Sequence, residues 1–319
     1  MLGAAAVVIW GVSGAFTRTL AERLGLFTSG ALVNLLSGAL ICAASRLRHG
    51  SWGDMRALPR RYVFVCGALY VFYVLSSYVS TAVAQTRQQA LAVGVIKFMW
   101  PVFAMLLTPL VLKKKASRWI WGSFALSASG AAAITVWGGG YGQDAAYILS
   151  DGFILPSALI ALASAAAWAL FSILTRKYME HVRSDFDGVG YFMLAAGALM
   201  ALALTFSPET GSELYSRGFS RESLGNSILN PIESGAELAF QILLSSLCAT
   251  IFWNMSMRRG NVVLVVAIAN MLPIISVLAS ALILGAKITL PVVAGSLLVT
   301  AGVFWGGHCL NTNPISKDG

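Results

Sequence analysis

The sequence contains few charged residues and few residues able to cross-link a fold. Only 11% of its 319 residues are charged and 57% are hydrophobic, a balance that excludes a soluble domain and predicts an integral membrane protein. Its four cysteines lie within or at the ends of apolar runs, which predicts packing residues rather than a disulfide framework. Its three histidines are far apart in sequence and show no metal-ligand spacing, so we expect neither a metal nor a cofactor.

Carboxylates are absent from the middle of every long apolar run. All 13 Asp and Glu residues lie at the ends of these runs or between them. Proton pumps and cation exporters usually carry an Asp or Glu at depth, where it exchanges a proton or binds the cation. We therefore expect no proton coupling through a carboxylate at the middle of the membrane.

Long apolar runs are abundant. A membrane-spanning helix needs about 20 predominantly apolar residues. Ten runs of suitable length lie roughly at 2–22, 28–45, 62–83, 89–112, 118–137, 153–176, 188–207, 236–255, 261–284 and 289–308. The predicted fold class is therefore an all-α membrane protein with ten transmembrane helices.

The basic residues behind the net charge of +9 are divided unequally between the two sides of the predicted membrane rather than gathered in one patch. Fifteen of the 22 Lys and Arg residues lie on the side of both termini, six lie on the opposite side, and Lys97 lies within a span. The positive-inside rule then predicts that both termini are cytoplasmic. Topology explains the basic character, so we expect the lipid bilayer as a partner and no nucleic acid, and the oligomeric state stays open.

The two halves of the chain resemble each other. Two windows align without internal gaps, the first with an offset of 158 residues and the second with an offset of 172. The aligned pairs include Trp10 with Trp168, Arg18 with Arg176, Glu22 with Glu180, Pro101 with Pro273 and Gly130 with Gly302.

Each half, 1–142 and 153–319, holds five predicted spans. Because five is odd, the second half must enter the membrane in the opposite sense to the first. Inverted-topology repeats are typical of secondary transporters, whose substrate site lies near the midplane between the halves. A duplicated helical scaffold without a transport function is the alternative.

Lys97 is the one strongly basic residue inside an apolar run. A buried ammonium is costly unless a partner or water stabilises it, and Pro101, one turn later, removes a backbone hydrogen bond from the same helix. Pro273 interrupts the matching position of the second half, and paired interruptions point to a transport site. We interpret Lys97 as part of a ligand or ion pathway. A structural lysine, solvated or bonded to backbone carbonyls, is the alternative.

Aromatic and weakly polar residues occupy the other deep positions. On the third span, Tyr70, Tyr73 and Ser77 are expected on one face, with Tyr78 and Thr81 on a neighbouring one. Taken singly, each aromatic is explained by lipid contact or core packing, and each amide equally well by a bond between helices. Gathered around one lysine, they favour a pocket. The candidate substrate-binding residues are Lys97, Trp100, Tyr78, Trp168, Tyr73, Phe171, Trp10, Asn34 and Asn270, and the candidate hinges are Pro101 and Pro273.

One cation, no deep acid and several aromatics suit a substrate with one carboxylate and a flat apolar part. The Lys97 ammonium would offset the carboxylate. Trp and Tyr faces would hold a ring and attract the substrate's ammonium by a cation–π contact worth about 0.5–2 kcal/mol. An aromatic amino acid has each of these groups, whereas a doubly charged phosphate calls for more than one deep base.

The two inverted five-span halves, the Trp10-Gly11 pair and the Pro-containing segments Met99–Leu112 and Met271–Leu284 resemble the drug/metabolite transporter superfamily. Within it, the EamA-type branch and its bacterial aromatic amino acid exporters are the most similar. The resemblance covers essentially the whole chain and implies an inner-membrane transporter that also releases aromatic cations such as methyl viologen. Small multidrug members rely on a glutamate in the first span. Here that span offers only Ser13 and Thr17, so their proton/drug exchange is not implied.

The sequence therefore predicts an exporter of small amphipathic metabolites, above all aromatic amino acids, that works by alternating access around a central cavity. Nucleotide sugars and purine-like metabolites are the rival substrates. An integral membrane enzyme lacks support, because the spans contain no His-rich cluster, Asp pair or Ser/Lys dyad. A retinal-type photoreceptor with a Schiff base on Lys97 would need a deep carboxylate counter-ion, which the spans also lack.

Overall fold

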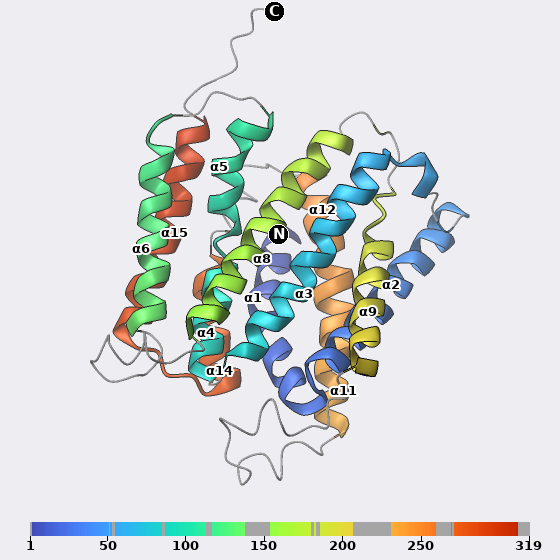
Figure 1. The fold of residues 1–319 in the computed structure, drawn as a ribbon, viewed down its shortest axis with the longest axis horizontal. Helices are drawn as coiled ribbons and strands as arrows, with labels where there is room; N and C mark the ends of the chain where they lie inside the picture. The colour runs from blue at the N-terminus through green and yellow to red at the C-terminus, as the bar shows by residue number, and fades with distance from the viewer. Residues whose placement is uncertain are drawn as a thin grey trace, which may run out of the picture.

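The computed structural model describes residues 2–50, 52, 55–84, 87–112, 117–137, 154–179, 182, 186–206, 231–259, 269 and 271–311. Within these ranges every regular element is a helix and no strand occurs (Figure 1). In chain order the helices are α1 (Leu2–Leu24), α2 (Leu26–His49), η1 (Met55–Ala57), η2 (Tyr62–Cys66), α3 (Gly67–Val83), α4 (Arg87–Lys97), α5 (Trp100–Leu112), α6 (Ile120–Trp137), α8 (Ile154–Met179), α9 (Val189–Phe206), α11 (Pro231–Ala239), η3 (Phe240–Cys248), α12 (Ala249–Arg259), α14 (Leu272–Leu284) and α15 (Leu290–Asn311).

Seven of the described helical segments are long and apolar enough to cross a membrane. They are Leu2–Leu24, Leu26–Leu47, Tyr62–Val83, Gln89–Val111, Leu155–Met179, Glu233–Trp253 and Leu290–Cys309. Three shorter apolar helices, Ile120–Ile134, Val189–Thr205 and Leu272–Leu284, lie where further spans are predicted. The predicted class of all-helical membrane protein is confirmed at this level.

Pro101 and Pro273, which occupy matched positions in the two halves, each lie in the first turn of a helix. Pro101 is the second residue of α5, and Pro273 is the second residue of α14. Proline is well tolerated there, because its missing N–H would have no partner within the helix. Both helices contain 13 residues. The two prolines therefore begin helices at matched positions rather than kink continuous ones.

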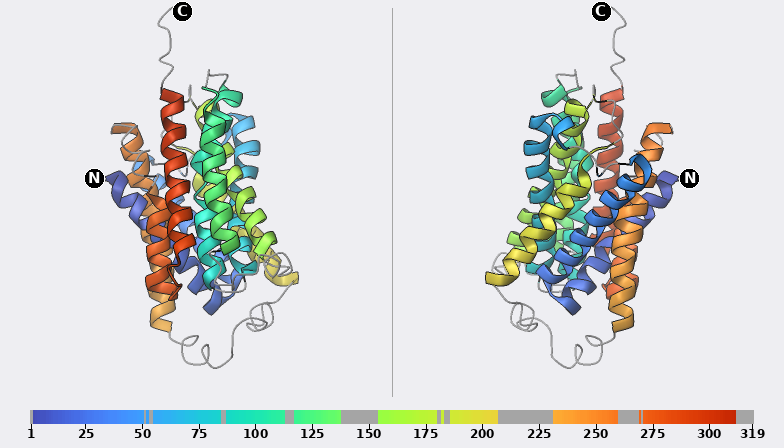
Figure 2. Two further views of the ribbon diagram at one scale, coloured as in Figure 1. Left: turned by 90° about the vertical axis from the view of Figure 1, so that its left-hand side faces the viewer. Right: turned by 90° about the vertical axis from the view of Figure 1, so that its right-hand side faces the viewer.

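Helices from the two halves of the chain pack side by side. α6 lies along α15, α2 along α9 and α3 along α8, and α1 packs against both α12 and α14. Figure 1 places the α6–α15 pair at one edge of the molecule and the α2–α9 pair toward the other, and Figure 2 presents each pair from its own side. Each pair joins a helix that ends before residue 138 to one that begins after residue 153.

Small residues allow these pairs to approach closely. A Cβ placed on Gly130 of α6 would lie 2.5 Å from the carbonyl oxygen of Gly295 of α15. A Cβ on Gly302 of α15 would lie 2.8 Å from the carbonyl oxygen of Ser123 of α6. Such close backbone approach at small residues is a common basis for helix association in membranes.

Two spans contain π-helical turns. η2 leads into α3, and η3 joins α11 to α12. Turns of this kind interrupt the ordinary helical hydrogen-bond ladder and are frequent at functional sites. η3 faces α1, where Gln241 Nε2 donates to the Ser13 carbonyl at 2.7 Å and to Thr17 Oγ1 at 2.8 Å. Side-chain bonds therefore fix this irregular segment to α1.

Candidate functional site

Lys97 is the last residue of α4, and its ammonium bonds to α3. Nζ donates to Ser77 Oγ at 3.2 Å and to Thr81 Oγ1 at 3.1 Å. The two hydroxyls are one helical turn apart and share a face of α3, so the expectation that Thr81 lies on a different face from Ser77 was wrong. An i, i+4 spacing already indicates a shared face. These hydrogen bonds give the ammonium two neutral partners, and they pair a Ser with Lys97, which was not expected from the sequence.

The chain leaves helical geometry directly after Lys97. Phe98 N donates to the Val95 carbonyl at 3.1 Å and Met99 N to the Ile96 carbonyl at 3.0 Å, and these tighter i to i−3 bonds end α4. The residue before a proline is biased away from helical conformation, although here the break lies two to three residues before Pro101. Lys97 therefore sits where one helix ends inside an apolar run.

An aromatic cluster lies between α3 and α8. The Tyr73 and Trp168 ring centroids are 4.6 Å apart, and Trp168 lies 5.3 Å from Phe171. Tyr70 adds contacts at 5.3 Å to Phe171 and 6.2 Å to Trp168. The Ser164 hydroxyl donates to the Tyr73 carbonyl at 3.2 Å and ties α8 to this turn of α3. The structure thus brings together three of the predicted site residues.

Tyr78 lies at the edge of the same apolar group. Its ring packs against α2, where a Cβ on Gly30 would lie 3.2 Å from Tyr78 Cδ1. Because Tyr78 follows Ser77 directly, α3 carries both a hydroxyl bonded to Lys97 and the aromatic group. The absence of a side chain at Gly30 leaves room for the ring.

Trp10 belongs to a second aromatic group. Its ring centroid lies 5.4 Å from that of Trp253 on α12, and its Nε1 donates to the Ser245 carbonyl of η3 at 3.1 Å. Phe98 and Ile275 pack against the same small core. The predicted aromatics therefore divide into two groups. Lys97 bonds to α3, which belongs to the first group, and the next residue, Phe98, packs in the second.

Three candidates are not brought into either aromatic group. Asn34 is buried on α2, and its Nδ2 donates to the Gly30 carbonyl of its own helix at 2.8 Å. Trp100 is half-buried at the start of α5, and it forms no aromatic ring pair within the described part of the chain. Asn270 lies outside the described residues.

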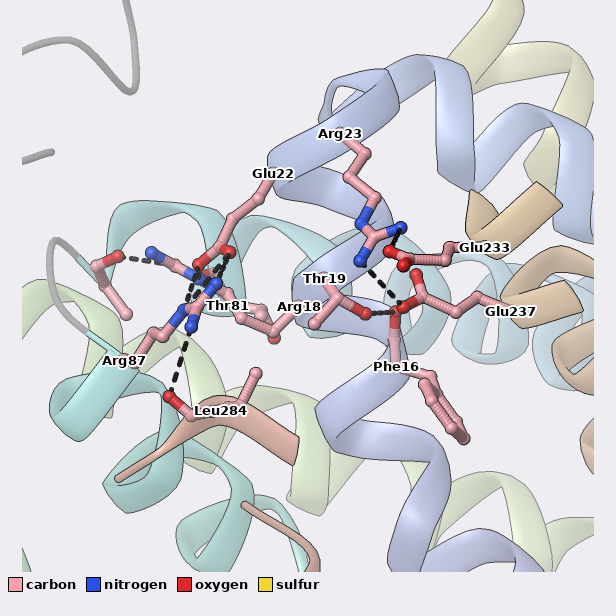
Figure 3. A network of polar contacts seen from close by, with 11 residues as sticks. Phe16, Arg18, Thr19, Glu22, Arg23, Thr81, Arg87, Glu233, Glu237 and Leu284 are labelled. Atoms are coloured by element: carbon pink, nitrogen blue, oxygen red, sulfur yellow. Dashed lines mark hydrogen bonds and ion pairs between the residues drawn. The ribbon is translucent and has the colours of Figure 1, made fainter. Parts of the chain in front are cut away.

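The buried charges of α1 were not expected. Arg18 is one of the six basic residues assigned to the outer ends of the spans. In the structure the side chains of Arg18 and Glu22 are only 1% and 6% exposed, and Arg18 Nε lies 2.7 Å from Glu22 Oε1 (Figure 3). Arg176, which the repeat aligns with Arg18, is exposed in the last turn of α8. An Arg and a Glu four residues apart can pair on one helix face, and this spacing was the available signal.

The described residues contain no group of three or more His, Cys, Asp or Glu side chains that could hold a metal ion. Lys97 instead bonds to two hydroxyls of α3, and the same helix α3 carries Tyr73 of the aromatic cluster. These groups suit the non-covalent binding of an amphipathic anion or zwitterion.

Comparison with known proteins gives consistent relatives. The aromatic amino acid exporter YddG of Salmonella typhimurium (strain 14028s / SGSC 2262) is 25% identical over 303 residues, which cover 95% of this chain and 94% of that protein. The aromatic amino acid exporter YddG of Escherichia coli (strain K12) is 24% identical over 303 residues with the same coverage. A solved crystal structure with 21% identity shares the fold at a TM-score of 0.61, covering 99% of this chain and 98% of that one.

The family model of EamA-like transporters matches residues 1–136 and 155–305. These segments make up most of the chain and include Lys97, the α3–α8 aromatic cluster and both helix-starting prolines. The protein therefore belongs to the EamA-like transporter family.

Proposed function

We propose that this transporter exports aromatic amino acids across a bacterial inner membrane by alternating access. The proposal rests on one observation. The Lys97 ammonium bonds to two hydroxyls of α3, and α3 also forms the aromatic cluster together with α8. The relatives named as aromatic amino acid exporters support the same substrate class, and they cover nearly the whole chain.

Lys97 is the proposed host for the substrate carboxylate. A carboxylate attracts an ammonium more strongly than a neutral hydroxyl does, because both partners then carry a full charge. An arriving carboxylate can therefore replace Ser77 or Thr81 as a partner of Nζ. The hydroxyls would then donate to the carboxylate, so that α3 and α4 bind it together.

The α3–α8 aromatic cluster is the proposed contact for the substrate ring. Trp168 and Tyr73 present π-faces that can stack on a flat ring, and they can attract the substrate's ammonium from the same side. Tyr78, Phe171 and Trp10 complete the proposed set. Trp100, Asn34 and Asn270 are also proposed, although no described contact brings them, or Trp10 of the second aromatic group, to this cluster.

We also propose that the chain consists of two inverted five-helix repeats, 1–142 and 153–319. The offset of 172 residues supports this, because it relates α5 to α14 at both ends: Trp100 to Leu272 and Leu112 to Leu284. The same offset relates Gly130 to Gly302 and Ser123 to Gly295. A two-fold axis between the halves would convert the Gly130–Gly295 approach into the Gly302–Ser123 approach, and both are present.

Both termini are proposed to lie in the cytoplasm, on the basis of the distribution of Lys and Arg. A membrane-impermeant thiol reagent can test this with a single cysteine at Arg87, whose side chain is 43% exposed. Labelling is expected in intact cells and not in inside-out vesicles. The reverse pattern would overturn the proposed orientation while leaving the substrate proposal intact.

Transport by purified protein in liposomes tests the substrate. Lys97→Gln is expected to lower phenylalanine counterflow at least tenfold, because a lost charge-assisted bond is worth about 1.5–3 kcal/mol. Lys97→Arg is expected to retain part of the activity. Lys177→Gln is the matched control, since Lys177 is an exposed lysine whose Nζ donates to the Val111 carbonyl at 3.1 Å. Wild-type counterflow by Lys97→Gln, or preference for nucleosides in competition, would exclude the proposed role.

A further inference from the structure

A buried ion-pair cluster lies at the end of the molecule where α1, α3 and α14 finish (Figure 3). Glu22 is its centre. Its carboxylate meets Arg18 Nε of the same helix at 2.7 Å and Arg87 Nη2 of α4 at 2.8 Å. One carboxylate on α1 therefore joins two arginines that reach it from different directions.

Arg18 connects α1 to the end of α3. Its Nη1 donates to the Thr81 carbonyl at 2.7 Å and to the Ala84 carbonyl at 2.6 Å. α3 ends at Val83, and the last four carbonyls of a helix have no donor within it. Arg18 thus supplies hydrogen bonds that the end of α3 requires.

Arg87 makes the corresponding contact with α14. Gly285, in left-handed conformation with φ of 65°, ends α14 after Leu284. The Leu284 carbonyl accepts a hydrogen bond from Arg87 Nη1 at 3.3 Å. Arg87 therefore binds α1 through Glu22 and α14 through Leu284 at the same time.

The charges in this cluster nearly balance. The C-terminus of a helix carries roughly half a negative charge, and two such ends meet one carboxylate and two guanidinium groups here. Removal of either Glu22 or Arg87 leaves an unbalanced charge beside buried groups. The closed contact between these helices is thus stable when all three charged side chains are present, and it is destabilised when one of them is removed.

Water reaches the cluster from the Arg87 side. The side chain of Arg87 is 43% exposed, whereas those of Arg18 and Glu22 are 1% and 6% exposed. Ion pairs that water can reach are weakly held. The ion pair that breaks most readily is therefore the one between Arg87 and Glu22. When it breaks, α4 and α14 are no longer held to the end of α1.

The cluster touches the proposed substrate site through one residue. Thr81 accepts a hydrogen bond from Lys97 Nζ on its hydroxyl at 3.1 Å and from Arg18 Nη1 on its carbonyl at 2.7 Å. Thr81 therefore links Lys97 directly to the ion-pair cluster at this end of the molecule.

We propose that Arg18, Glu22 and Arg87 form a gate of the transport pathway, closed in this structure, which opens when Arg87 leaves Glu22 and the end of α14 moves away from α1. The gate rests on the proposed function, since it lies beside Lys97 on the route of the exported molecule. Arg18 stays on α1 and continues to bond α3, so the moving parts are the start of α4 and the end of α14.

A cysteine at Ser77 reports whether the gate is open, because Ser77 lies beside Lys97 behind the cluster. The background protein has Cys42, Cys66, Cys248 and Cys309 replaced by Ala. A membrane-impermeant thiol reagent is added from the side on which a single cysteine at Arg87 is labelled. Glu22→Gln and Arg87→Gln are each expected to raise the rate of Ser77→Cys labelling about tenfold, as expected when the closed state loses its favourable contacts. Arg87→Lys, which keeps the cation, is expected to raise it less.

Arg23→Gln is the matched control. Arg23 lies on the same turn of α1 and pairs with Glu233 at 2.8 Å and with Glu237 at 3.5 Å on α11, not with α4 or α14. Its loss is expected to leave the labelling rate unchanged. Equal rates in Arg23→Gln and Arg87→Gln would overturn the gate. If Glu22→Gln is not monodisperse on gel filtration, Arg87→Gln decides alone, since its side chain is half-exposed. No substrate is added, so the result is independent of the Lys97 transport test.

Discussion

Gly11 of α1 lies directly against Ile275 of α14. A Cβ added to Gly11 would come within 2.8 Å of the Ile275 Cβ. Because Ile275 is β-branched and stiff at its first side-chain torsion, it cannot turn away as a long flexible side chain would. The contact fixes how closely α1 and α14 approach each other.

Gly11→Ala is therefore expected to destabilise the protein by about 1–3 kcal/mol, the usual cost of an overpacked core. The melting temperature in detergent measures the effect. Gly14→Ala is the control on the same helix, where the new Cβ would have only an ordinary contact at 4.0 Å with Ser276 Oγ. That change is expected to be neutral or to stabilise the helix by about 0.5–1 kcal/mol. Equal melting temperatures for the two variants would contradict the packing described here.

Gly130→Ala and Gly302→Ala are expected to lower the melting temperature by similar amounts. Each new methyl would meet backbone of the partner helix, the Gly295 carbonyl in one case and the Ser123 carbonyl in the other. Gly307→Ala, on α15 with no atom within 4 Å of the new Cβ, is the control and is expected to keep wild-type stability. A large effect at Gly130 with none at Gly302 would argue against equivalent packing by the two halves.

Thr81→Val is expected to weaken phenylalanine transport by roughly tenfold, because the bound substrate carboxylate loses a hydroxyl donor and a hydrogen bond to a charged group is worth about 1.5–3 kcal/mol. The loss is expected in KM more than in kcat, since the change acts on the group that receives the carboxylate. Thr81→Ser restores the hydroxyl and is expected to recover most of the activity. Concentration-dependent counterflow measures both constants. A Thr81→Ser variant as poor as Thr81→Val would assign Thr81 a packing role instead.

Trp168→Leu is expected to raise the KM for phenylalanine more than the KM for a smaller aliphatic amino acid that is still transported. Trp168 contacts Tyr73 at 4.6 Å and Phe171 at 5.3 Å, and aromatic pairs contribute about 0.5–1.5 kcal/mol beyond their area. Trp119→Leu is the control, because Trp119 is 58% exposed near the start of α6. Uniform loss of all substrates in Trp168→Leu would mean that the ring only supports the fold.

The sequence predicts those features that depend on local chemistry. Apolar length locates the spans, because a helix must satisfy its own backbone in lipid. Pro101 and Pro273 are recognisable as interruptions of their apolar runs, because proline lacks an N–H and restricts the residue before it. Lys97 is recognisable as unusual because a single charge stands alone in an apolar run. Each of these predictions needs only neighbours in sequence.

Features that depend on distant neighbours could not be predicted. The burial of Arg18 follows from the end of α3, more than 60 residues further along the chain, and no local pattern contains that partner. The division of the aromatics into two groups follows from the packing of α8 on α3 and of α12 on α1. The shared face of Ser77 and Thr81, by contrast, needs no distant neighbour. Their spacing of four residues was sufficient to predict it.

The unequal surroundings of Arg18 and Arg176 have a consequence for the energetics of the cycle. In this structure the first is enclosed and the second faces solvent, although the proposed repeats would make them counterparts. A molecule of two equivalent halves can exchange these surroundings, enclosing the second arginine while releasing the first. The free energy lost when one arginine is released would then be regained when the other is enclosed. If the proposed repeats are equivalent, the two conformations have nearly equal free energies, and a substrate gradient is then enough to bias the exchange between them.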